Sequence, residues 1–178
     1  PEIAEIFTKL SKGKLNSYLF DIAVPVLSKK DELSDNYLID MILDKAGQKG
    51  TGKWTSIDAL DRGVLLSSIT ESVFARCISS EKEKRMKLSK IFKDNSTSSI
   101  PHSLFPIPSI PLDKFITILE NGLYAGMLSS YAQGFDLIDI AVKEEKWTIN
   151  LAETARIWEG GCIIRAEILN FLHKAFLK

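Results

Sequence analysis

The stretch from Ala46 to Thr55, AGQKGTGKWT, combines glycines and lysines in a spacing that could bind an anion. From Gly47 it reads G-x-x-x-x-G-K, the start of a loop by which many nucleotide-binding proteins hold phosphate. That pattern continues with Ser or Thr as a magnesium ligand, whereas this chain has Trp54. A buried strand should precede such a loop, but residues 35–48 have helical spacing. The nucleotide-binding interpretation therefore lacks both its strand and its metal ligand.

A plain turn between two helices would explain the three glycines of this stretch, because glycine adopts backbone angles that other residues avoid. Such a turn would not require Lys49 and Lys53, nor Thr51 between them. Together with backbone amides freed by the glycines, these side chains could hold a phosphate or a carboxylate. The stretch therefore predicts an anion site of some kind.

Arg76 is a further candidate for the same site. It follows Ile69 by seven residues, so on a helix it points within roughly 20° of the same direction, close to Val73 on the apolar stripe. An arginine that faces inward needs a partner. Periodicity leaves two partners open: an acid, for example Glu71, in an ion pair, or an anionic ligand in a cleft, which suits the planar guanidinium.

Composition excludes several classes of protein. About 45% of the 178 residues are apolar, and 23 basic side chains balance 23 acidic ones. This balance argues against a strongly basic nucleic-acid-binding face, though not against a local basic cluster. The sequence contains no run of 18 uncharged apolar residues that could span a membrane. We therefore expect neither nucleic acid nor membrane as a partner.

The cysteines and histidines show no pattern of metal ligands. Cys77 and Cys162 lie far apart in mostly apolar runs, which predicts buried, reduced thiols and a cytoplasmic protein. His102 and His173 have no ligand spacing with each other or with the cysteines, so we expect no metal site.

Almost every apolar pattern has the helical period, which predicts an all-α fold. We expect one helical-bundle-like domain over residues 1–178, with two or three long helices and several short ones. The short helices should lie near residues 3–10, 15–27 and 37–42. The helical pattern begins at once and is unfinished at residue 178, so we expect a truncated piece of a longer protein.

The elements after the glycine-rich stretch include the first expected long helix. Thr55 and Asp58 resemble a capping box, which places Trp54 at the mouth of a helix that ends at Gly63. The next helix should run over residues 65–92, through the charged run EKEKRMKLSKIF.

Residues 94–111 interrupt the pattern with four of the six prolines and predict a surface loop. A second long helix should cover residues 113–143. It carries a row of small residues at every fourth position, on one side of the helix: Gly122, Gly126, Ser130 and Gly134. Each glycine inside a helix costs roughly 1 kcal/mol relative to alanine. We therefore expect another helix packed closely on this row.

The last long helix should run from Trp147 toward Lys178, with Gly160 and Gly161 in its middle.

Several of these runs resemble one known family. The segments DNYLIDMILDKAGQKGTGKWTSIDALDRG and SSITESVFARCISSEKEKR look like the middle of decarboxylating 6-phosphogluconate dehydrogenase. The early run LNSYLFDIA and the later runs SYAQGFDLI and IWEGGCIIRAEIL resemble further family segments in the right order. The resemblance covers practically the whole chain, and K-G-T-G-K-W with S-V-F-A-R is specific. It implies part of the family's C-terminal all-helical domain.

This resemblance implies a function and a site. Family enzymes oxidise 6-phosphogluconate with NADP, release carbon dioxide and form ribulose 5-phosphate, a step of the pentose phosphate pathway, and they use no metal. They are homodimers. In the family's pattern Lys49, Thr51 and Arg76 bind the substrate, chiefly its phosphate. We expect Lys53 and Trp54 to shape the loop.

The resemblance also implies what this chain lacks. The family's catalytic lysine and glutamate lie upstream of Pro1, and the NADP-binding Rossmann domain lies further upstream. A tail arginine and histidine, given to the neighbouring subunit, lie beyond Lys178. We therefore expect no catalytic and no cofactor-binding residue here, and no dehydrogenase activity from these 178 residues alone.

The sequence departs from the family's pattern at two places, and alternative functions stay open. Glu159 stands where the family usually has arginine, which puts any ion pair there in doubt, and the proline-rich loop over residues 96–111 looks particular to this chain. One alternative function is a helical dimerisation module without a ligand, packed through the row of small residues and Gly160–Gly161. Another is a nucleotide-binding loop.

Overall fold

The computed structural model describes residues 2–95 and 110–178, and within these ranges the regular secondary structure is helical, with two isolated β-bridges. The all-α prediction is confirmed. The described helices are α1 (Glu2–Leu10), α2 (Tyr18–Ser28), α3 (Leu38–Met41), α4 (Thr51–Asp61), α5 (Ser67–Ser80), α6 (Lys82–Asn95), α7 (Leu112–Glu145), α8 (Leu151–Trp158) and α9 (Ile168–Phe176).

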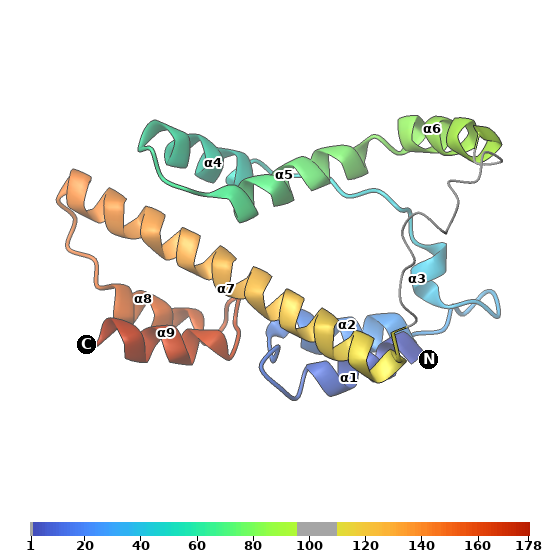
Figure 1. Ribbon diagram of the computed structural model, residues 1–178, viewed down its shortest axis with the longest axis horizontal. Helices are drawn as coiled ribbons and strands as arrows, with labels where there is room; N and C mark the ends of the chain where they lie inside the picture. The colour runs from blue at the N-terminus through green and yellow to red at the C-terminus, as the bar shows by residue number, and fades with distance from the viewer. Residues whose placement is uncertain (1, 96–109) are drawn as a thin grey trace.

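Helix α7 is the longest described helix, and α5 and α8 pack directly against it (Figure 1). Helices α4 and α5 lie on one side of its C-terminal half, and α8 and α9 lie on the other. Leu137 joins the first apolar core, with Ala59 and Leu66, while Phe135 joins the second, with Leu169. Because residues two apart on a helix point about 200° apart, one stretch of α7 can serve both cores.

Side-chain caps begin two of the helices as their sequences suggest. Ser17 accepts a hydrogen bond from the backbone N–H of Phe20 at the start of α2, and Asn150 accepts one from Glu153 at the start of α8. Each cap satisfies a backbone donor that has no partner inside the helix.

The helix expected over residues 65–92 is two helices, because the chain breaks at Glu81 between α5 and α6. Arg85 explains the break. Its Nη2 donates to the carbonyl oxygens of Ser79, at the end of α5, and of Asp44, and its Nη1 donates to the Asp44 carboxylate. Arg85 thus satisfies a terminal carbonyl of α5 and connects the break to a distant loop.

The single last helix expected after Trp147 is also wrong, since α8 and α9 are separated by residues 159–167. Gly161 has a φ of 66°, a left-handed conformation that favours glycine and ends the helix. Arg165 and Glu167 in this connection make backbone hydrogen bonds to Tyr18 and Asn16 at 2.9 Å. Contacts with a distant segment therefore replace the helical hydrogen bonds there.

The long helix expected over residues 113–143 is confirmed by α7, but among the described residues no helix packs closely on Gly122 and Gly126 of its row of small residues. A Cβ added at Gly122 or Gly126 would meet no atom within 4 Å among the described residues, and one at Gly134 would lie 3.9 Å from Ile69 Cδ1. The four-residue period predicted which face of the helix carries the small residues, but it could not predict what packs on that face.

The remaining expectations have mixed outcomes. Cys77 is exposed and Cys162 is half-buried, so the prediction of buried thiols is wrong for Cys77. His173 Nδ1 lies 2.8 Å from the carbonyl oxygen of Ala152, a structural contact between α9 and α8. His102 and most of the proline-rich loop lie outside the described residues. No described helix is long and apolar enough to cross a membrane.

Candidate anion-binding site

The glycine-rich stretch forms the turn that leads into α4. Gly50 is the residue before the helix and has a φ of 103°, which a residue with a side chain rarely adopts. The helix then begins at Thr51, earlier than predicted, and the Thr55 hydroxyl donates to the Thr51 carbonyl oxygen. The expected capping box of Thr55 with Asp58 is therefore wrong, because both residues already lie inside the helix.

Gly52 brings the start of α4 against α5. A Cβ at this position would lie 2.7 Å from Val73 Cγ2, closer than two carbon atoms can approach without displacement. Valine on a helix has one strongly preferred rotamer, so it could not easily move aside. The second glycine of G-T-G therefore allows a close approach of two helices, one turn before Arg76 on α5.

The residues just before this turn are tied to the C-terminal part of α5 by three hydrogen bonds. The Ala46 N–H donates to the Ser79 hydroxyl at 3.0 Å, and the Gln48 side-chain amide donates to Cys77 Sγ at 3.4 Å. Arg76 Nε donates to the carbonyl oxygen of Gly47 at 2.6 Å. The loop and the helix that carry the predicted site residues are thus held side by side.

The three predicted site residues are exposed side chains on this loop and helix. Lys49 lies in the loop, Thr51 is the first residue of α4, and Arg76 lies on the face of α5 that meets Gly47. Among the described residues no carboxylate forms an ion pair with Arg76, so the acid-partner alternative, including Glu71, finds no support. The expectation that Arg76 faces the interior is also wrong.

The exposure of Arg76 has a simple physical reason. Its predicted direction was based on Ile69, seven residues earlier, and Ile69 is only partly buried against the first core. The C-terminal end of α5 extends beyond that core and lies beside the loop instead. The Nε of the guanidinium therefore donates to the Gly47 carbonyl oxygen, while its two terminal nitrogens have no described hydrogen-bond partner. They can face an anion in the solvent-accessible space beside Lys49 and Thr51.

Asp44, an acidic residue on this loop, already forms an ion pair with Arg85. The hydrogen bond and the charge of Arg85 lower the pKa of Asp44 below its ordinary value. Asp44 therefore stays ionised and paired with Arg85, at 2.9 Å from Nη1. Sequence reasoning missed this pair, because the two residues lie far apart in the chain and neither has a distinctive spacing.

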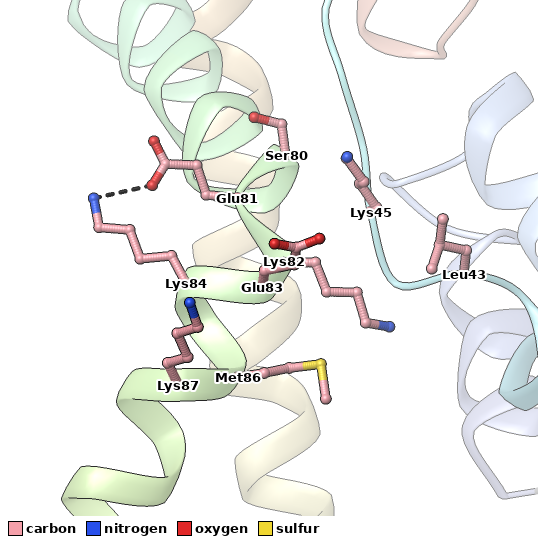
Figure 2. Close-up of a pocket in the computed structure, with 9 residues that line it drawn as sticks. All are labelled: Leu43, Lys45, Ser80, Glu81, Lys82, Glu83, Lys84, Met86 and Lys87. Carbon is pink, nitrogen blue, oxygen red and sulfur yellow. Dashed lines mark ion pairs between the residues drawn. The ribbon is translucent and has the colours of Figure 1, made fainter.

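A second group of lysines surrounds an open hollow of about 720 Å³ at the junction of α5 and α6 (Figure 2). Lys45, Lys82 and Lys87 line it, but their ammonium groups point in different directions in Figure 2. Lys84 pairs with Glu81 at 3.0 Å, and Glu83 adds a further negative charge to the lining. The ammonium groups of this hollow therefore do not point to one common place.

Glu159, the departure noted in the sequence, lies at the C-terminal end of α8. Its Oε1 is buried and has no hydrogen-bond partner among the described residues. The described part of the chain therefore offers no ion pair at this position.

The described residues define an all-helical domain with a glycine-rich candidate anion site on one side of a long central helix. The family model for the 6-phosphogluconate dehydrogenase C-terminal domain matches residues 1–178. The chain belongs to the 6-phosphogluconate dehydrogenase family.

Curated relatives support this assignment. A decarboxylating 6-phosphogluconate dehydrogenase of Dictyostelium discoideum is 43% identical over 99% of this chain and 35% of its own length. One from Pseudescherichia vulneris is 47% identical over 98% of this chain and 37% of its own length. The chain thus spans little more than a third of the relatives that it matches.

A solved structure is similar over the same region. It is Plasmodium falciparum 6-phosphogluconate dehydrogenase, described in its apo form and in complex with its cofactor NADP⁺ and with its substrate 6-phosphogluconate. It is 42% identical with a TM-score of 0.84, over 98% of this chain and 36% of that chain. At this level of similarity the arrangement of the helices, and not only their type, is shared.

Proposed function

We propose that this chain is the substrate-binding segment of an NADP-dependent enzyme that oxidatively decarboxylates 6-phosphogluconate to ribulose 5-phosphate. The observation that carries the proposal is the set of contacts that holds the loop of Lys49 and Thr51 against the helix of Arg76. One ammonium, one hydroxyl and one guanidinium then lie around the same part of the surface, beside the start of α4. A phosphate monoester is the group that this combination suits best.

The positive end of α4 adds to this preference. The N–H groups of its first turn lack partners inside the helix, and the peptide dipoles make this end of the helix partly positive. Gly50 supplies the left-handed backbone conformation of this turn, and Gly52 allows the first turn of α4 to lie close against α5, the helix of Arg76. The phosphate would therefore meet backbone donors as well as Lys49, Thr51 and Arg76.

The chemical role of this segment would be to hold and orient the substrate. Oxidation of 6-phosphogluconate gives a β-keto acid, which loses carbon dioxide readily once a positioned acid and base manage the protons. By the family's pattern these groups belong to a part of the protein upstream of Pro1. A fixed phosphate keeps the reacting carbons in one place relative to them.

NADP does not fit the described residues of this chain. They include no strand that leads into a G-x-G-x-x-G turn, and the turn before α4 follows an extended loop after the short α3. We assign the cofactor to a Rossmann domain elsewhere in the longer protein, and residues 1–178 to one part of its helical domain. Two free thiols fit a reducing cytoplasm.

A titration of this chain tests the proposal. We expect 6-phosphogluconate to bind, and gluconate, which lacks the phosphate, to bind at least tenfold more weakly in calorimetry. Arg76→Ala should weaken 6-phosphogluconate binding about tenfold without loss of helicity. Arg156→Ala is the matched control, because Arg156 only pairs with Glu153 on the exposed face of α8. Equal affinity for both ligands would refute a phosphate site, and binding of ATP–magnesium alone would favour the nucleotide-loop alternative.

A second candidate function is helical dimerisation, and one observation favours it. Gly122 and Gly126 leave a strip of α7 open, beside exposed Phe115 and Leu119. We infer that a second copy of the protein covers this strip, as a homodimer would. The two functions are compatible. Failure to bind 6-phosphogluconate by a chain that self-associates would favour dimerisation without a ligand.

A further inference from the structure

Arg62 lies at the C-terminal end of α4 and connects it to α7. Its Nε lies 3.1 Å from both carboxylate oxygens of Asp58, one turn earlier on α4. Its Nη1 donates to Glu144 and its Nη2 donates to Glu145 at 3.0 Å, both at the end of α7. The side chain is only 15% exposed. An arginine whose three nitrogens each meet a carboxylate is held in one orientation.

The cluster is unbalanced in charge, with three carboxylates around one guanidinium. Hydrogen bonds to Glu145 and Glu144 raise the pKa of Arg62 above its ordinary value, so it stays charged. Without Arg62, the carboxylate of Asp58 on α4 would face those of Glu144 and Glu145 on α7 with no positive group between them. Like charges would then push the ends of the two helices apart.

The remaining contacts between α4 and α7 leave room for such movement. The first apolar core holds α4 near its C-terminal end through Ala59, which belongs to the same cluster as Leu137. Next to this core an open cleft of about 480 Å³ separates the helices, with Trp54 and Arg62 among its lining residues on α4 and Ala141 on α7. Side-chain packing therefore does not fill the space between the two helices along the whole length of α4.

We propose that Arg62 is a positioning residue for the loop of Lys49 and Thr51. By fixing one end of α4 to α7, it sets the direction of the helix whose other end begins at Thr51. A helix of 11 residues is roughly 16 Å long, so a tilt of about 10° would move its far end by roughly 3 Å. A displacement of that size would break hydrogen bonds to a bound phosphate. This inference rests on the function proposed above.

Hydrogen exchange on the intact chain tests the link between the two ends of α4. Arg62→Met keeps most of the apolar stem and removes the charge. We expect the amides of Trp54 and Thr55, the first in α4 with acceptors inside the helix, to exchange about tenfold faster; the Trp54 N–H bonds to the Gly50 carbonyl. Amides of α5 and α9 serve as internal references against a general loss of stability. Arg156→Met, which removes an exposed ion pair on α8, should leave residues 51–55 unchanged.

Two further variants separate positioning from a merely local role. Arg62→Lys keeps the charge but loses the fork that reaches three carboxylates, so it should give an intermediate rate. Arg62→Glu combined with Glu145→Arg restores a tie between α4 and α7 with reversed charges, and it should return exchange to within about threefold of the parent chain. Faster exchange confined to residues 58–63, or an unchanged rate at Trp54 and Thr55, would overturn the inference.

Binding provides the functional measurement. Arg62→Met should raise the Kd for 6-phosphogluconate about fivefold to tenfold, and the charge-reversed pair should recover most of this loss. If the parent chain binds and Arg62→Met binds equally well, this inference fails and the phosphate site stands. If the parent chain does not bind, the proposed function fails, while hydrogen exchange still decides whether Arg62 controls the loop.

Discussion

The two halves of α7 have the same secondary structure but opposite surroundings. In its C-terminal half, Phe135 is 2% exposed and Leu137 is 6% exposed, in two different cores. In its N-terminal half, Phe115 is 50% exposed and Ile118 is 49% exposed, and a Cβ at Gly126 would meet no described atom within 4 Å. Both halves are rich in apolar residues, so composition does not distinguish them. Partners distinguish them, because the described contacts of the N-terminal half are those of Lys14 with Asn121 and Tyr124, which leave Phe115 and Ile118 half exposed.

The largest difference between the halves should appear when a phenylalanine is removed from each. Phe135 packs against Trp158 and Phe176, with ring centroids 5.1 and 4.9 Å away. Phe135→Ala should lower the free energy of unfolding by about 3–5 kcal/mol, through lost burial and a cavity. Phe115→Ala, the matched substitution on the exposed half, should cost less than about 1 kcal/mol in dilute chain. Chemical denaturation measures both, and equal losses would mean that the N-terminal half is covered within one chain.

A smaller effect should follow from filling the open strip. Gly126→Leu should weaken self-association at least tenfold, about 1.4 kcal/mol, because the new side chain occupies the space left for a second copy. Analytical ultracentrifugation over a range of concentrations measures this. Lys114→Leu is the control, since Lys114 points about 120° away around the helix. Unchanged association in both variants would assign the strip to some other partner.

The smallest effect should come from Gly122→Ala. A Cβ there would meet no described atom within 4 Å, so only the helix preference of alanine remains. We expect the free energy of unfolding of dilute, monomeric chain to rise by about 1 kcal/mol. A loss of stability under these conditions would show that the strip is already occupied within the monomer.

Periodicity was sufficient to predict the all-helical fold and the extent of α7. The strip of apolar and small residues over residues 113–143 has an unbroken helical period, and no strongly competing turn signal lies within it. Gly63, with a φ of 69°, likewise marked the end of α4 correctly, because glycine acts through its own backbone. Gly47 did not mark the end of α3, which ends at Met41.

Helix breaks imposed by distant partners could not be predicted in the same way. The break at Glu81 depends on Arg85 reaching Asp44, which lies on another segment. The break after α8 could have been predicted from Gly160 and Gly161, since two adjacent glycines in a helix cost roughly 2 kcal/mol. The apolar period continues on both sides of these glycines, and that pattern favours one unbroken helix.

The candidate site was partly visible in the sequence. The resemblance identified Lys49, Thr51 and Arg76, and their roles stay predictions until binding is measured. The i, i+4 spacing of Asp58 and Arg62 was also visible as a common helical pair. The further contact of Arg62 with Glu144 could not be predicted, because this contact depends on how α4 crosses α7.

The contact between residues 16–18 and residues 165–167 also affects how the chain folds. Ser17 pairs with Ala166 in an isolated β-bridge, and Arg165 Nη2 reaches Asp21 at 2.8 Å. This junction closes a loop of roughly 150 residues, for which the length-dependent entropy cost is about 4 kcal/mol. Contacts of such long range form only after much of the intervening chain has become ordered, and they slow folding.

The same junction is a direct link between the α1–α2 and α8–α9 pairs. Two backbone hydrogen bonds and one ion pair join them, although each pair packs mainly within itself. Since the closing step adds few new contacts, the two pairs should assemble independently and dock late. The docked junction would then be among the first parts of the molecule to open, before either pair melts.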